Sequence, residues 1–492
     1  MSTEIRVRFA PAPTGNLHIG GVRTALYNYL FAKKNKGKFI LRIEDTDKER
    51  SLPEYLDSII NSLRWMGLEW DEGPGAGGRL ADLAEFNQYY QSKRAKYYER
   101  ALEHLIKMKK VYKCFCTPEE LKIKREICLK AGKDPGYDGR CLKLSDSQRE
   151  EFKHRCYPFA YRLKTPESGT ISFKDIIKGD IEIDLATIND FVITKSGGSP
   201  AYNFACAVDD GEMHISHVIR GDDHIYNTPK QILIYKALDW SIPEYAHLPQ
   251  VHGTDGKKLS KRTGAVSVEE YKDKGYLPEA INNYLALIGW STEDSQQLFE
   301  WEELIEKFEL KRCSTSCGIF DIEKLNWMNG KYMRSMEPKV LAQRAMKWLK
   351  YTGVVKDEYN IPDNVIKAIG LEQEKFEFLT DIPDRIDFMV RDDIEYDEKA
   401  VEKRLKKEGA RDILEAITAI LQDTQDFTAV TLENRIKEYC EKNELGAGKV
   451  FHPVRVAVSG RAMGPGLFEI LEFIGKERSI QRISHALDKF VE

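Results

Sequence analysis

The sequence lacks the features that mark membrane-spanning, secreted, collagen-like and disordered chains. Nowhere in its 492 residues is there an apolar run close to the ~20 residues that span a bilayer. The opening MSTEIRVRFA carries charges at alternate positions and has no apolar core, so we expect no signal peptide. Apolar residues make up 42% and charged residues 31% of the chain, without repeats or low-complexity tracts. We therefore expect a cytosolic globular protein of about three or four domains.

Cysteine is scarce and the charge is nearly balanced. The nine cysteines are an odd number, and in a reducing compartment we expect thiols or metal ligands rather than disulfides. The 75 Lys and Arg against 79 Asp and Glu give a net charge of −4, which excludes a basic field over the whole molecule. A nucleic-acid partner must then bind local basic surfaces. Residues 105–133, with nine Lys or Arg and three Glu, and KRLKK at 403–407 are candidates, although a solvated helix face explains either alone.

The N-terminal region has the pattern of a doubly wound sheet. Residues 4–10 alternate between large apolar and other side chains, which predicts a strand. A Pro/Gly turn follows, and we expect an amphipathic helix from Gly20. The apolar run 39–43 is typical of a buried parallel strand, and SLPE at 51–54 predicts a capping box that begins a second helix. Strand, helix, strand and helix within about 60 residues predict a doubly wound, parallel, Rossmann-like α/β sheet.

Changes of pattern divide the chain into five expected segments. Closely spaced cysteines, turns and short β-rich pieces interrupt the α/β pattern after residue 106, and helical spacing dominates beyond residue 265. We expect the first half of the doubly wound domain at 1–106, an inserted α+β domain at 107–200, the second half at 201–264, and helical regions at 265–334 and 335–492.

The stretch RFAPAPTGNLHIGG at 8–21 lies between the first expected strand and the first expected helix. In doubly wound folds this crevice binds ligands, and a helix N-terminus favours phosphate. Gly20 and Gly21 let a nucleotide approach the backbone closely, and His18 can donate a hydrogen bond to a phosphate oxygen. An incidental turn would explain HIGG alone, but its strand–turn–helix context favours a nucleotide site.

A second motif, KKLSKR at 257–262, follows a candidate strand and two glycines. Its lysines are point charges that can follow phosphate oxygens as negative charge builds on them. A basic loop alone is usually a solvated surface. Together with the first motif, on the other half of the sheet, it indicates a site for a nucleotide.

These two motifs resemble the HIGH and KMSKS signatures of class I aminoacyl-tRNA synthetases. Gly21 stands where many class I enzymes have a second histidine, but glutamyl enzymes commonly lack it. Ala12 replaces a serine that is frequent in the family. Over essentially the whole chain the sequence resembles bacterial-type glutamyl-tRNA synthetases, through APAPTGNLHIGG, RIEDTD at 42–47, Tyr202 followed by VDD at 208–210, VIR at 218–220 and PGLFEIL at 465–471.

The resemblance implies a glutamate–tRNA ligase. Glutamate would attack the α-phosphate of ATP, which enters with Mg²⁺, and the glutamyl group of the adenylate would pass to the 3′ end of tRNA. Positioning and charge stabilisation do most of such chemistry. The resemblance assigns catalysis to His18, Lys258 and Lys261. It assigns ATP contacts to Gly20, His18, Asp223, Leu259, Ser260 and Lys261, with His224 as a further candidate.

Glutamate has two carboxylates and one ammonium, so its site needs cations and an anion. Arg8 and Arg220 suit the carboxylates, because arginine binds them bidentately. Glu44 suits the ammonium, and Tyr202 is expected as a hydrogen-bonding wall. The family positions agree with these four assignments. A structural ion pair is the alternative explanation of each charged residue.

Three cysteines in the expected insertion suggest a structural zinc site. The thiols of Cys114, Cys116 and Cys141 are ligands that tetrahedral zinc prefers, and some members of the family have this C-x-C…C arrangement. Three buried reduced thiols are the explanation without a metal.

The fourth ligand of such a site is open. Zinc-binding members often have a histidine two residues after the third cysteine, but Lys143 stands there. Tyr137 is the first substitute, because a shortened relative uses a tyrosine four residues before that cysteine. His154 and Cys156 are the alternatives.

The resemblance also assigns partners to the segments. The insertion 107–200 would contact the acceptor end of tRNA, 265–334 its stem, and 335–492 the anticodon. We expect tRNA(Glu), L-glutamate and ATP as partners, no membrane, and a working monomer.

Several related functions remain as alternatives. A non-discriminating enzyme would also charge tRNA(Gln). A catalytically inactive tRNA-binding relative would have eroded motifs, and a nucleotidyltransferase does not explain the helical C-terminal half. The short relative that glutamylates a modified tRNA base lacks the long region present here after Tyr332. Glutaminyl-tRNA synthetase has a β-barrel-rich C-terminal half, unlike the helical pattern of 335–492.

Overall fold

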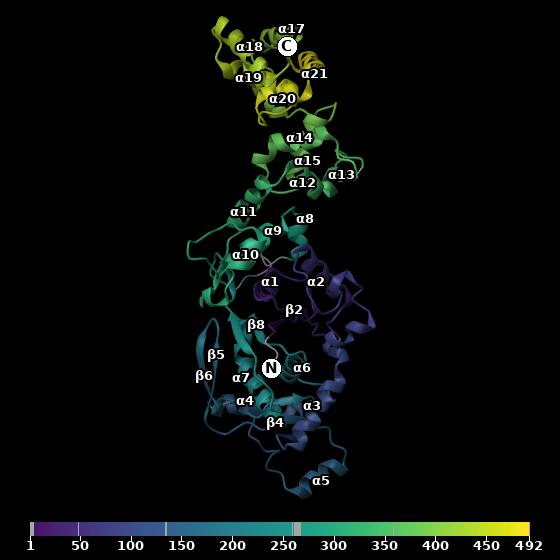
Figure 1. Ribbon diagram of the computed structural model, residues 1–492, viewed down its shortest axis with the longest axis vertical. Helices are drawn as coiled ribbons and strands as arrows, with labels where there is room; N and C mark the ends of the chain where they lie inside the picture. Colours follow the sequence, from purple (N-terminus) through teal and green to yellow (C-terminus); the bar gives the residue numbers. More distant parts are fainter. Residues whose placement is uncertain are drawn as a thin grey trace. The chain divides into compact units, whose positions relative to one another are not determined.

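The computed structural model describes residues 4–47, 49–132, 135–257, 259, 267–357 and 359–491, and it divides into two compact units (Figure 1). The first unit is formed by Met1–Glu270 and Ile281–Ile322, and the second by Tyr271–Ala280 and Glu323–Glu492. Each has its own hydrophobic cluster. No helix in these described ranges is both long and apolar enough to cross a membrane. The five segment boundaries expected from the sequence stay a prediction.

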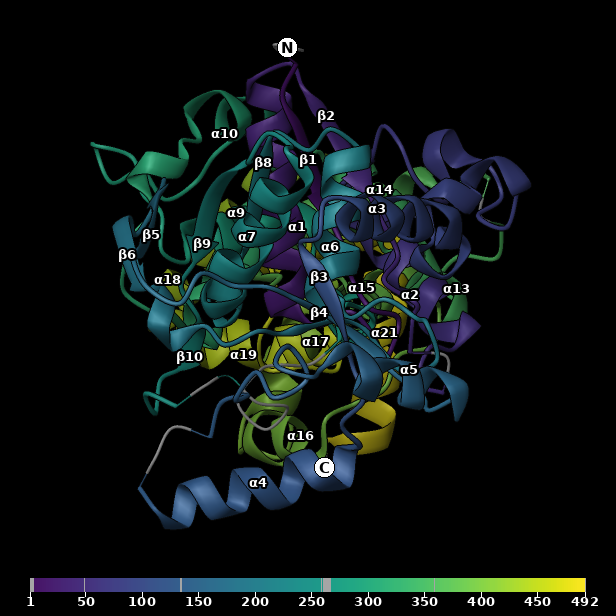
Figure 2. The same cartoon turned by 90° about the horizontal axis from the view of Figure 1, so that it is seen from below.

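Parallel strands form the centre of the first unit. β1 (Arg6–Phe9) pairs with β2 (Lys38–Leu41), and β8 (His217–Gly221) pairs with β9 (Glu244–Leu248), each pair in parallel. The amide of Ser216 donates to the carbonyl of Arg6 at 2.9 Å, so β8 lies next to β1, as Figure 2 shows. Nearly all residues of these strands are buried, as in a sheet with helices on both faces.

Helices connect these strands and confirm the predicted doubly wound α/β class. Helix α1 packs against β1 and β2, and ten of its sixteen residues are buried. The helices of this part of the unit are α1 (Ile19–Lys34), α2 (Pro53–Trp65), α3 (Ala95–Lys107), α6 (Tyr202–Glu212), α7 (Thr228–Leu238) and α10 (Trp301–Lys307). The residues of α8 (Val268–Asp273) and α9 (Pro278–Leu287) are divided between the two units.

The segment expected as an insertion contains helices and antiparallel strands, which confirms its α+β character. β3 (Val111–Cys114), β4 (Ala160–Leu163) and β7 (Val192–Thr194) form an antiparallel sheet, and α4 (Pro118–Lys130) and α5 (Asp146–His154) accompany it. The hairpin of β5 (Thr170–Asp175) and β6 (Gly179–Asp184) is not part of this antiparallel sheet. β5 pairs in parallel with β9 through Asp175 and Tyr245, so the hairpin extends the central sheet.

Two local predictions are wrong. SLPE does not form a capping box, because α2 begins at Pro53 and its N-cap is Leu52, without a capping side chain. Proline suits the first helical position, where its missing amide hydrogen leaves no bond unmade. The region beyond residue 265 is not wholly helical either. β11 (Gly318–Phe320) pairs in parallel with β10 (Val251–Gly253).

The second unit is helical, as predicted for the C-terminal half. Every regular element in the described part of 335–492 is a helix. Leu341, Ile386, Ile417, Val454 and Leu471 are fully buried in its single cluster. The helices are α11 (Ile322–Ser335), α12 (Pro338–Arg344), α13 (Met346–Tyr351), α14 (Asp363–Glu372), α15 (Asp381–Val390), α16 (Glu398–Arg404), α17 (Ala410–Asp423), α18 (Ala429–Lys442), α19 (Ala447–Ser459), α20 (Leu467–Ile474) and α21 (Lys476–Phe490).

Candidate active site and cysteine cluster

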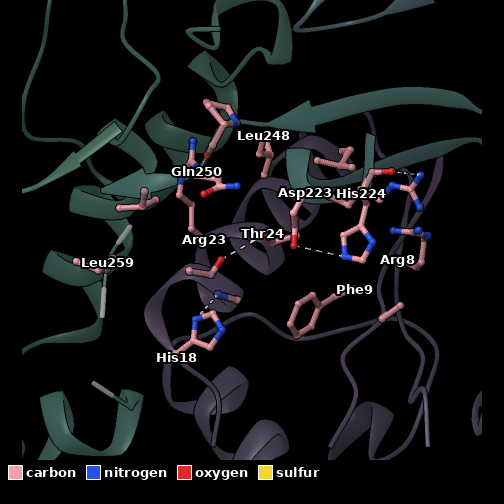
Figure 3. Close-up of a pocket in the computed structure, with 18 of the residues that line it drawn as sticks. Arg8, Phe9, His18, Arg23, Thr24, Asp223, His224, Leu248, Gln250 and Leu259 are labelled. Atoms are coloured by element: carbon pink, nitrogen blue, oxygen red, sulfur yellow. Dashed lines mark hydrogen bonds and ion pairs between the residues drawn. The ribbon is translucent and has the colours of Figure 1, made fainter. Parts of the chain in front are cut away.

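Residues at the carboxyl ends of β1, β8 and β9 and at the start of α1 line a cavity of about 310 Å³ (Figure 3). Doubly wound folds bind ligands in such a crevice. Eight residues that the sequence predicts for the site lie around it, and so does His224, the further candidate. The eight are Arg8, His18, Gly20, Glu44, Tyr202, Arg220, Asp223 and Leu259.

His18 is the N-cap of α1. Its Nδ1 accepts a hydrogen bond from the Gly21 amide at 3.2 Å (Figure 3). In a neutral ring the proton is then on Nε2, the other nitrogen. A donor at that position can bind a phosphate oxygen, and the dipole of α1 adds positive potential at the same end.

Arg8 projects from β1 against a buried carboxylate. Its Nε lies 3.1 Å from Oδ1 of Asp210 in α6, and Nη1 of Arg42 lies 2.5 Å from the same oxygen. Arg42 is fully buried and also contacts Glu44 at 3.2 Å. Burial raises the pKa of Asp210, but the charges of Arg42 and Arg8 outweigh it and lower that pKa to about 2. Arg8 is therefore a cation whose charge already has a fixed partner.

Glu44 adds a carboxylate to the cavity wall. Its side chain is 12% exposed, and burial raises its pKa although Arg42 and Arg8 oppose the shift. Tyr202 begins α6, and its hydroxyl lies 3.2 Å from Nδ1 of His224. A carboxylate and an aromatic ring on one cavity wall can hold an ammonium group.

Arg220, at the end of β8, has different partners from Arg8. Its Nε donates to Nε2 of His247 at 3.2 Å, and its Nη2 donates to the hydroxyl of Thr228 at 2.8 Å. Within the described ranges no carboxylate lies within 4.0 Å of this guanidinium, and its buried Nη1 has no hydrogen-bond partner. Arg220 thus offers an unmatched charge and an unused donor.

Sequence reasoning missed several residues of this region. Arg23 on α1 lines the cavity, and its Nη1 donates to the carbonyl of Pro249 at 2.7 Å. The available signal was a single arginine on the apolar face of the expected helix. Asp210 entered only as a letter of a motif, and its signal was a pair of aspartates within an apolar helical stretch. Nothing in the sequence pattern marks His247 or Asp175 as a functional residue, because each lies in a strand-like run.

The lysine motif falls only partly within the described structure. Lys258, Ser260 and Lys261 lie outside the described residues, so their roles stay predictions. Leu259 is described and lines the cavity, and its amide donates to the carbonyl of Val251 at 3.1 Å. The motif therefore reaches the cavity at this residue.

The sulfur atoms of Cys114, Cys116 and Cys141 lie within 4.8 Å of one another. The hydroxyl of Tyr137 is 3.5 Å from Sγ of Cys114 and 3.8 Å from Sγ of Cys116. It also accepts the amide of Cys141 at 3.2 Å, and Arg162 lies over its ring, 3.7 Å from the centroid. Three thiols and one phenol oxygen thus converge, which is the donor number of a tetrahedral zinc site.

The alternative fourth ligands are not part of this cluster. Among the described residues, only Cys114, Cys116 and Cys141 form a group of three or more close cysteine, histidine or acidic ligand atoms, and neither His154 nor Cys156 belongs to it. Lys143, at the position of the family's histidine, is exposed.

Comparison with known proteins gives matches over the whole chain. The family model for the catalytic domain of class I tRNA synthetases (E and Q) matches residues 4–327, and that for an anticodon binding domain matches 340–487. Glutamate–tRNA ligase 2 of Thermoanaerobacter pseudethanolicus is 43% identical over 486 residues, which are 99% of this chain and 98% of that protein. Glutamate–tRNA ligase of Elusimicrobium minutum is 44% identical over 487 residues, 98% of this chain and 99% of the relative.

A solved structure has the same fold over its full length. It is a glutamate tRNA ligase from Elizabethkingia meningosepticum in complex with its amino acid, with a TM-score of 0.89 and 34% identity, covering 99% of this chain and 100% of that one. Identity at this level over both units exceeds what a shared nucleotide-binding fold requires. The chain belongs to the class I aminoacyl-tRNA synthetases, in the glutamate–tRNA ligase family.

Proposed function

We propose that the chain activates L-glutamate with ATP and transfers the glutamyl group to the 3′ end of tRNA(Glu). The observation that supports this best is one cavity that combines a helix N-terminus capped by His18 with Arg8, Arg220 and Glu44. The helix end suits nucleotide phosphates, and the charged side chains suit a dicarboxylic amino acid. The names of the full-length relatives support the same activity. Such an enzyme works in the cytosol as part of protein synthesis, and we propose a monomer as its working form.

The first half-reaction is an in-line substitution at the α-phosphorus of ATP, which is bound with Mg²⁺. An α-carboxylate oxygen of glutamate forms the new P–O bond, and pyrophosphate leaves with the electron pair of the broken bond. The Nε2 proton of His18 and the amides at the start of α1 stabilise the charge on the phosphate oxygens. Lys258 and Lys261 bind the leaving phosphates in this proposal.

In the second half-reaction, a hydroxyl oxygen of the terminal ribose of tRNA bonds to the carbonyl carbon of the adenylate. The bond from this carbon to the phosphate oxygen breaks, AMP leaves, and the hydroxyl proton is lost to the phosphate. Neither step needs a covalent bond to the protein, so the contribution of the chain is orientation and charge.

Glutamate matches the charges of the cavity group by group. Glu44 binds the ammonium, with Tyr202 beside it, while Arg8 and Arg220 bind the two carboxylates. Glutamine would leave a buried guanidinium without an anion, and a buried unmatched charge costs several kcal/mol. This charge balance favours glutamate as the substrate.

We propose zinc as a structural ion of the segment 107–200. Cys114, Cys116, Cys141 and Tyr137 would hold it, because their sulfur and oxygen atoms already converge. The ion would link the end of β3 to the turn at 137–141. A structural zinc ion stabilises a small fold by joining segments that bury little apolar surface.

We propose that a basic hollow in the second unit binds phosphates of tRNA. Arg404 ends α16 and Lys407 follows it. Both line a cavity of about 220 Å³ together with Glu408 and with Lys449 and His452 of α19. Within the described ranges no carboxylate lies within 4.0 Å of the charged groups of Arg404, Lys407 and Lys449. Lys449 of a second helix thus adds a cation to those of the KRLKK run, whereas a merely solvated face would lie on one helix alone.

The experiment that tests the proposed function is aminoacylation with radiolabelled glutamate and glutamine on purified tRNA(Glu) and tRNA(Gln). Glutamate on tRNA(Glu) alone would establish a discriminating ligase. Glutamate on both tRNAs would establish the non-discriminating alternative, which needs a downstream amidotransferase. If tRNA binds but no glutamate is transferred to either, the proposal is wrong and the chain is an inactive tRNA-binding relative.

A further inference from the structure

Arg220 is buried at the cavity wall and is held by neutral groups. Its Nε donates to Nε2 of His247 at 3.2 Å, and its Nη2 donates to the Thr228 hydroxyl at 2.8 Å and the His224 carbonyl at 3.4 Å. Its Nη1 is buried and without a hydrogen bond among the described residues. A buried arginine with only neutral partners keeps its full charge for a ligand.

His247 is in turn fixed by Asp175. Its Nδ1 lies 2.6 Å from Oδ2 of Asp175, and both side chains are completely buried. Arg220 and His247 are register partners in β8 and β9, and Asp175 ends the neighbouring strand β5. Asp175 also accepts the backbone amides of Ile177 at 2.9 Å and Lys178 at 2.8 Å. Its carboxylate cannot turn without losing these bonds.

This arrangement fixes the protons of the imidazole. Because Nε of Arg220 carries a hydrogen, Nε2 of His247 must accept it with its lone pair. The one proton of the neutral ring is then on Nδ1 and is donated to Asp175. Burial lowers the pKa of His247, in agreement with a neutral ring. A carboxylate in place of the imidazole would neutralise Arg220, and a protonated imidazole would repel it.

We propose that Asp175 and His247 are positioning residues that hold Arg220 so that its Nη1 binds the side-chain carboxylate of glutamate and rejects the carboxamide of glutamine. This inference rests on the proposed function and adds the groups that set its amino-acid specificity. The α-carboxylate loses its charge when it becomes the mixed anhydride, whereas the side-chain carboxylate stays charged throughout. An arginine without a fixed counter-charge suits the group that stays charged. Arg8, already paired with Asp210, suits the other.

The substitution Asp175→Asn tests the pair through its protons. The amide oxygen is expected to keep the backbone amides of Ile177 and Lys178, which turns the new NH₂ toward Nδ1 of His247. The ring must then carry its proton on Nε2, where it faces a donor of Arg220. In ATP–pyrophosphate exchange with tRNA present, we expect KM for glutamate to rise about 10- to 100-fold and KM for ATP to change less than about threefold. The preference in kcat/KM for glutamate over glutamine should fall at least about tenfold.

Two substitutions at His247 separate hydrogen bonding from packing. His247→Gln keeps an acceptor for Arg220, so KM for glutamate should rise no more than about fivefold. His247→Phe keeps a ring of similar size without an acceptor, and it should behave like Asp175→Asn. The matched control is Tyr245→Phe. The Tyr245 ring is parallel to that of His247, at 5.9 Å between centroids, and its buried hydroxyl has no partner in the described structure.

The outcomes are distinct. The positioning role of Asp175 and His247 is excluded by the following result. The wild type activates glutamate, and the folded variants Asp175→Asn and His247→Phe have the same KM for glutamate and the same amino-acid preference as the wild type. Equal losses for glutamate and ATP, or the same defect in His247→Gln and His247→Phe, would mean a general structural role and would also exclude it. If the wild type itself does not activate glutamate, the proposed function fails instead. Thermal melts check folding, and the two His247 variants suffice if Asp175→Asn does not fold.

Discussion

At the scale of single side chains, the cavity depends on how each arginine is partnered. Arg8 shares the carboxylate of Asp210 with the fully buried Arg42, whereas Arg220 is bound by an imidazole and a hydroxyl. A desolvated guanidinium needs either a fixed anion or a bound one. Arg8 therefore has a fixed anion even without a ligand, whereas in our proposal a carboxylate of the substrate completes the partner set of Arg220.

The first residue-scale prediction concerns Asp210→Asn. The change removes the anion between two buried arginines, and we expect a loss of about 3–5 kcal/mol in the free energy of unfolding at pH 7. Urea unfolding measures it. Glu293→Gln is the control, because Glu293 makes the same kind of contact with Arg312 at 2.9 Å while its side chain is 90% exposed. A loss at Asp210 no larger than in this control would contradict the assigned network.

The same carboxylate sets a pH dependence. The folded-state pKa of Asp210, about 2, lies below its ordinary value of 3.8, so its contribution to stability is complete above about pH 4 and is lost as the pH falls toward 2. Between pH 4 and 2, the free energy of unfolding of the wild type should therefore fall more steeply with decreasing pH than that of Asp210→Asn. Parallel stability curves for the two proteins in this window would exclude the effect.

The second residue-scale prediction concerns the lysine motif. Lys261→Ala should slow adenylate formation by roughly two or more orders of magnitude, because a cation on the leaving phosphates acts mainly in the transition state. Binding of tRNA should be unchanged. Pyrophosphate exchange and a filter-binding assay give the two readouts. Lys257→Ala removes a neighbouring lysine and should have little effect, and near-normal turnover of Lys261→Ala would exclude the assigned role.

Cavity residues were predictable where their side chains are of a type that binds a charged ligand and lie in a recognisable motif. Arg8, Glu44 and Arg220 lie in motifs next to strand ends, so their types and positions pointed to substrate. Their supporting residues were not predictable. Asp175 and His247 contact Arg220 only because strands β5, β9 and β8 are adjacent, and no local pattern contains that pairing.

At the scale of helices and strands, the chemically useful groups lie where elements end. The first turn of α1 presents its amides beside His18, and β8 and β9 end at the cavity. The cysteine cluster has the same character, because Cys114 ends β3 and Cys141 follows a turn at Gly139 with φ of 71°. Glycine suits that turn, since other residues rarely adopt a left-handed backbone.

The element-scale prediction is that freshly purified protein contains one zinc ion per chain. Cys116→Ser should lower zinc content and destabilise the segment 107–160, because the ion links β3 to the turn at 137–141. Tyr137→Phe tests the fourth ligand and should weaken zinc binding about 10- to 100-fold. Elemental analysis and competition with a chelator give the readouts.

The control for this prediction is Cys128→Ser, which removes a thiol of the same segment outside the cluster. It should leave the zinc content unchanged. Absence of metal from the wild type would end the zinc proposal, and full affinity in Tyr137→Phe would remove tyrosine from the ligand set.

Element positions were largely predictable, and their ends less so. The helix after Gly20 and the parallel strands have strong patterns, but the start of α2 depends on Pro53 occupying the first helical position. β11 escaped prediction because it has only three residues, too few for a periodic pattern.

At the scale of the whole molecule, charge is distributed rather than accumulated. The net charge of −4 cannot attract a polyanion, so affinity for tRNA must depend on local groups such as the hollow formed by Arg404, Lys407, Lys449 and His452. Binding at such a site has a defined dependence on salt.

The prediction for the whole molecule concerns how the affinity for tRNA depends on salt concentration. The double variant Arg404→Ala/Lys407→Ala should weaken tRNA binding about tenfold at 0.1 M salt and reduce the slope of log K against log salt by about 1–2. Lys437→Ala/Lys442→Ala removes the same charge from residues already paired with Glu433 and Glu438, and it should change neither quantity much. Equal effects of the two double variants would mean a general charge effect.

The architecture as a whole followed from the sequence: an α/β sheet with an α+β insertion and a helical C-terminal half. The composition of the central sheet did not. A hairpin from the expected insertion pairs with β9, and this depends on tertiary contacts between Asp175 and Tyr245 rather than on local propensity.

That hairpin bears on how such an enzyme could have arisen. If the segment 107–200 entered an older nucleotide-binding fold as one piece, it brought Asp175 with it. An ancestor without the segment would have kept the crevice for ATP but not the carboxylate that orients His247. By this route, the carboxylate that we propose as a positioning residue was acquired in a single event, and a shortened enzyme made by deleting the segment would lose it.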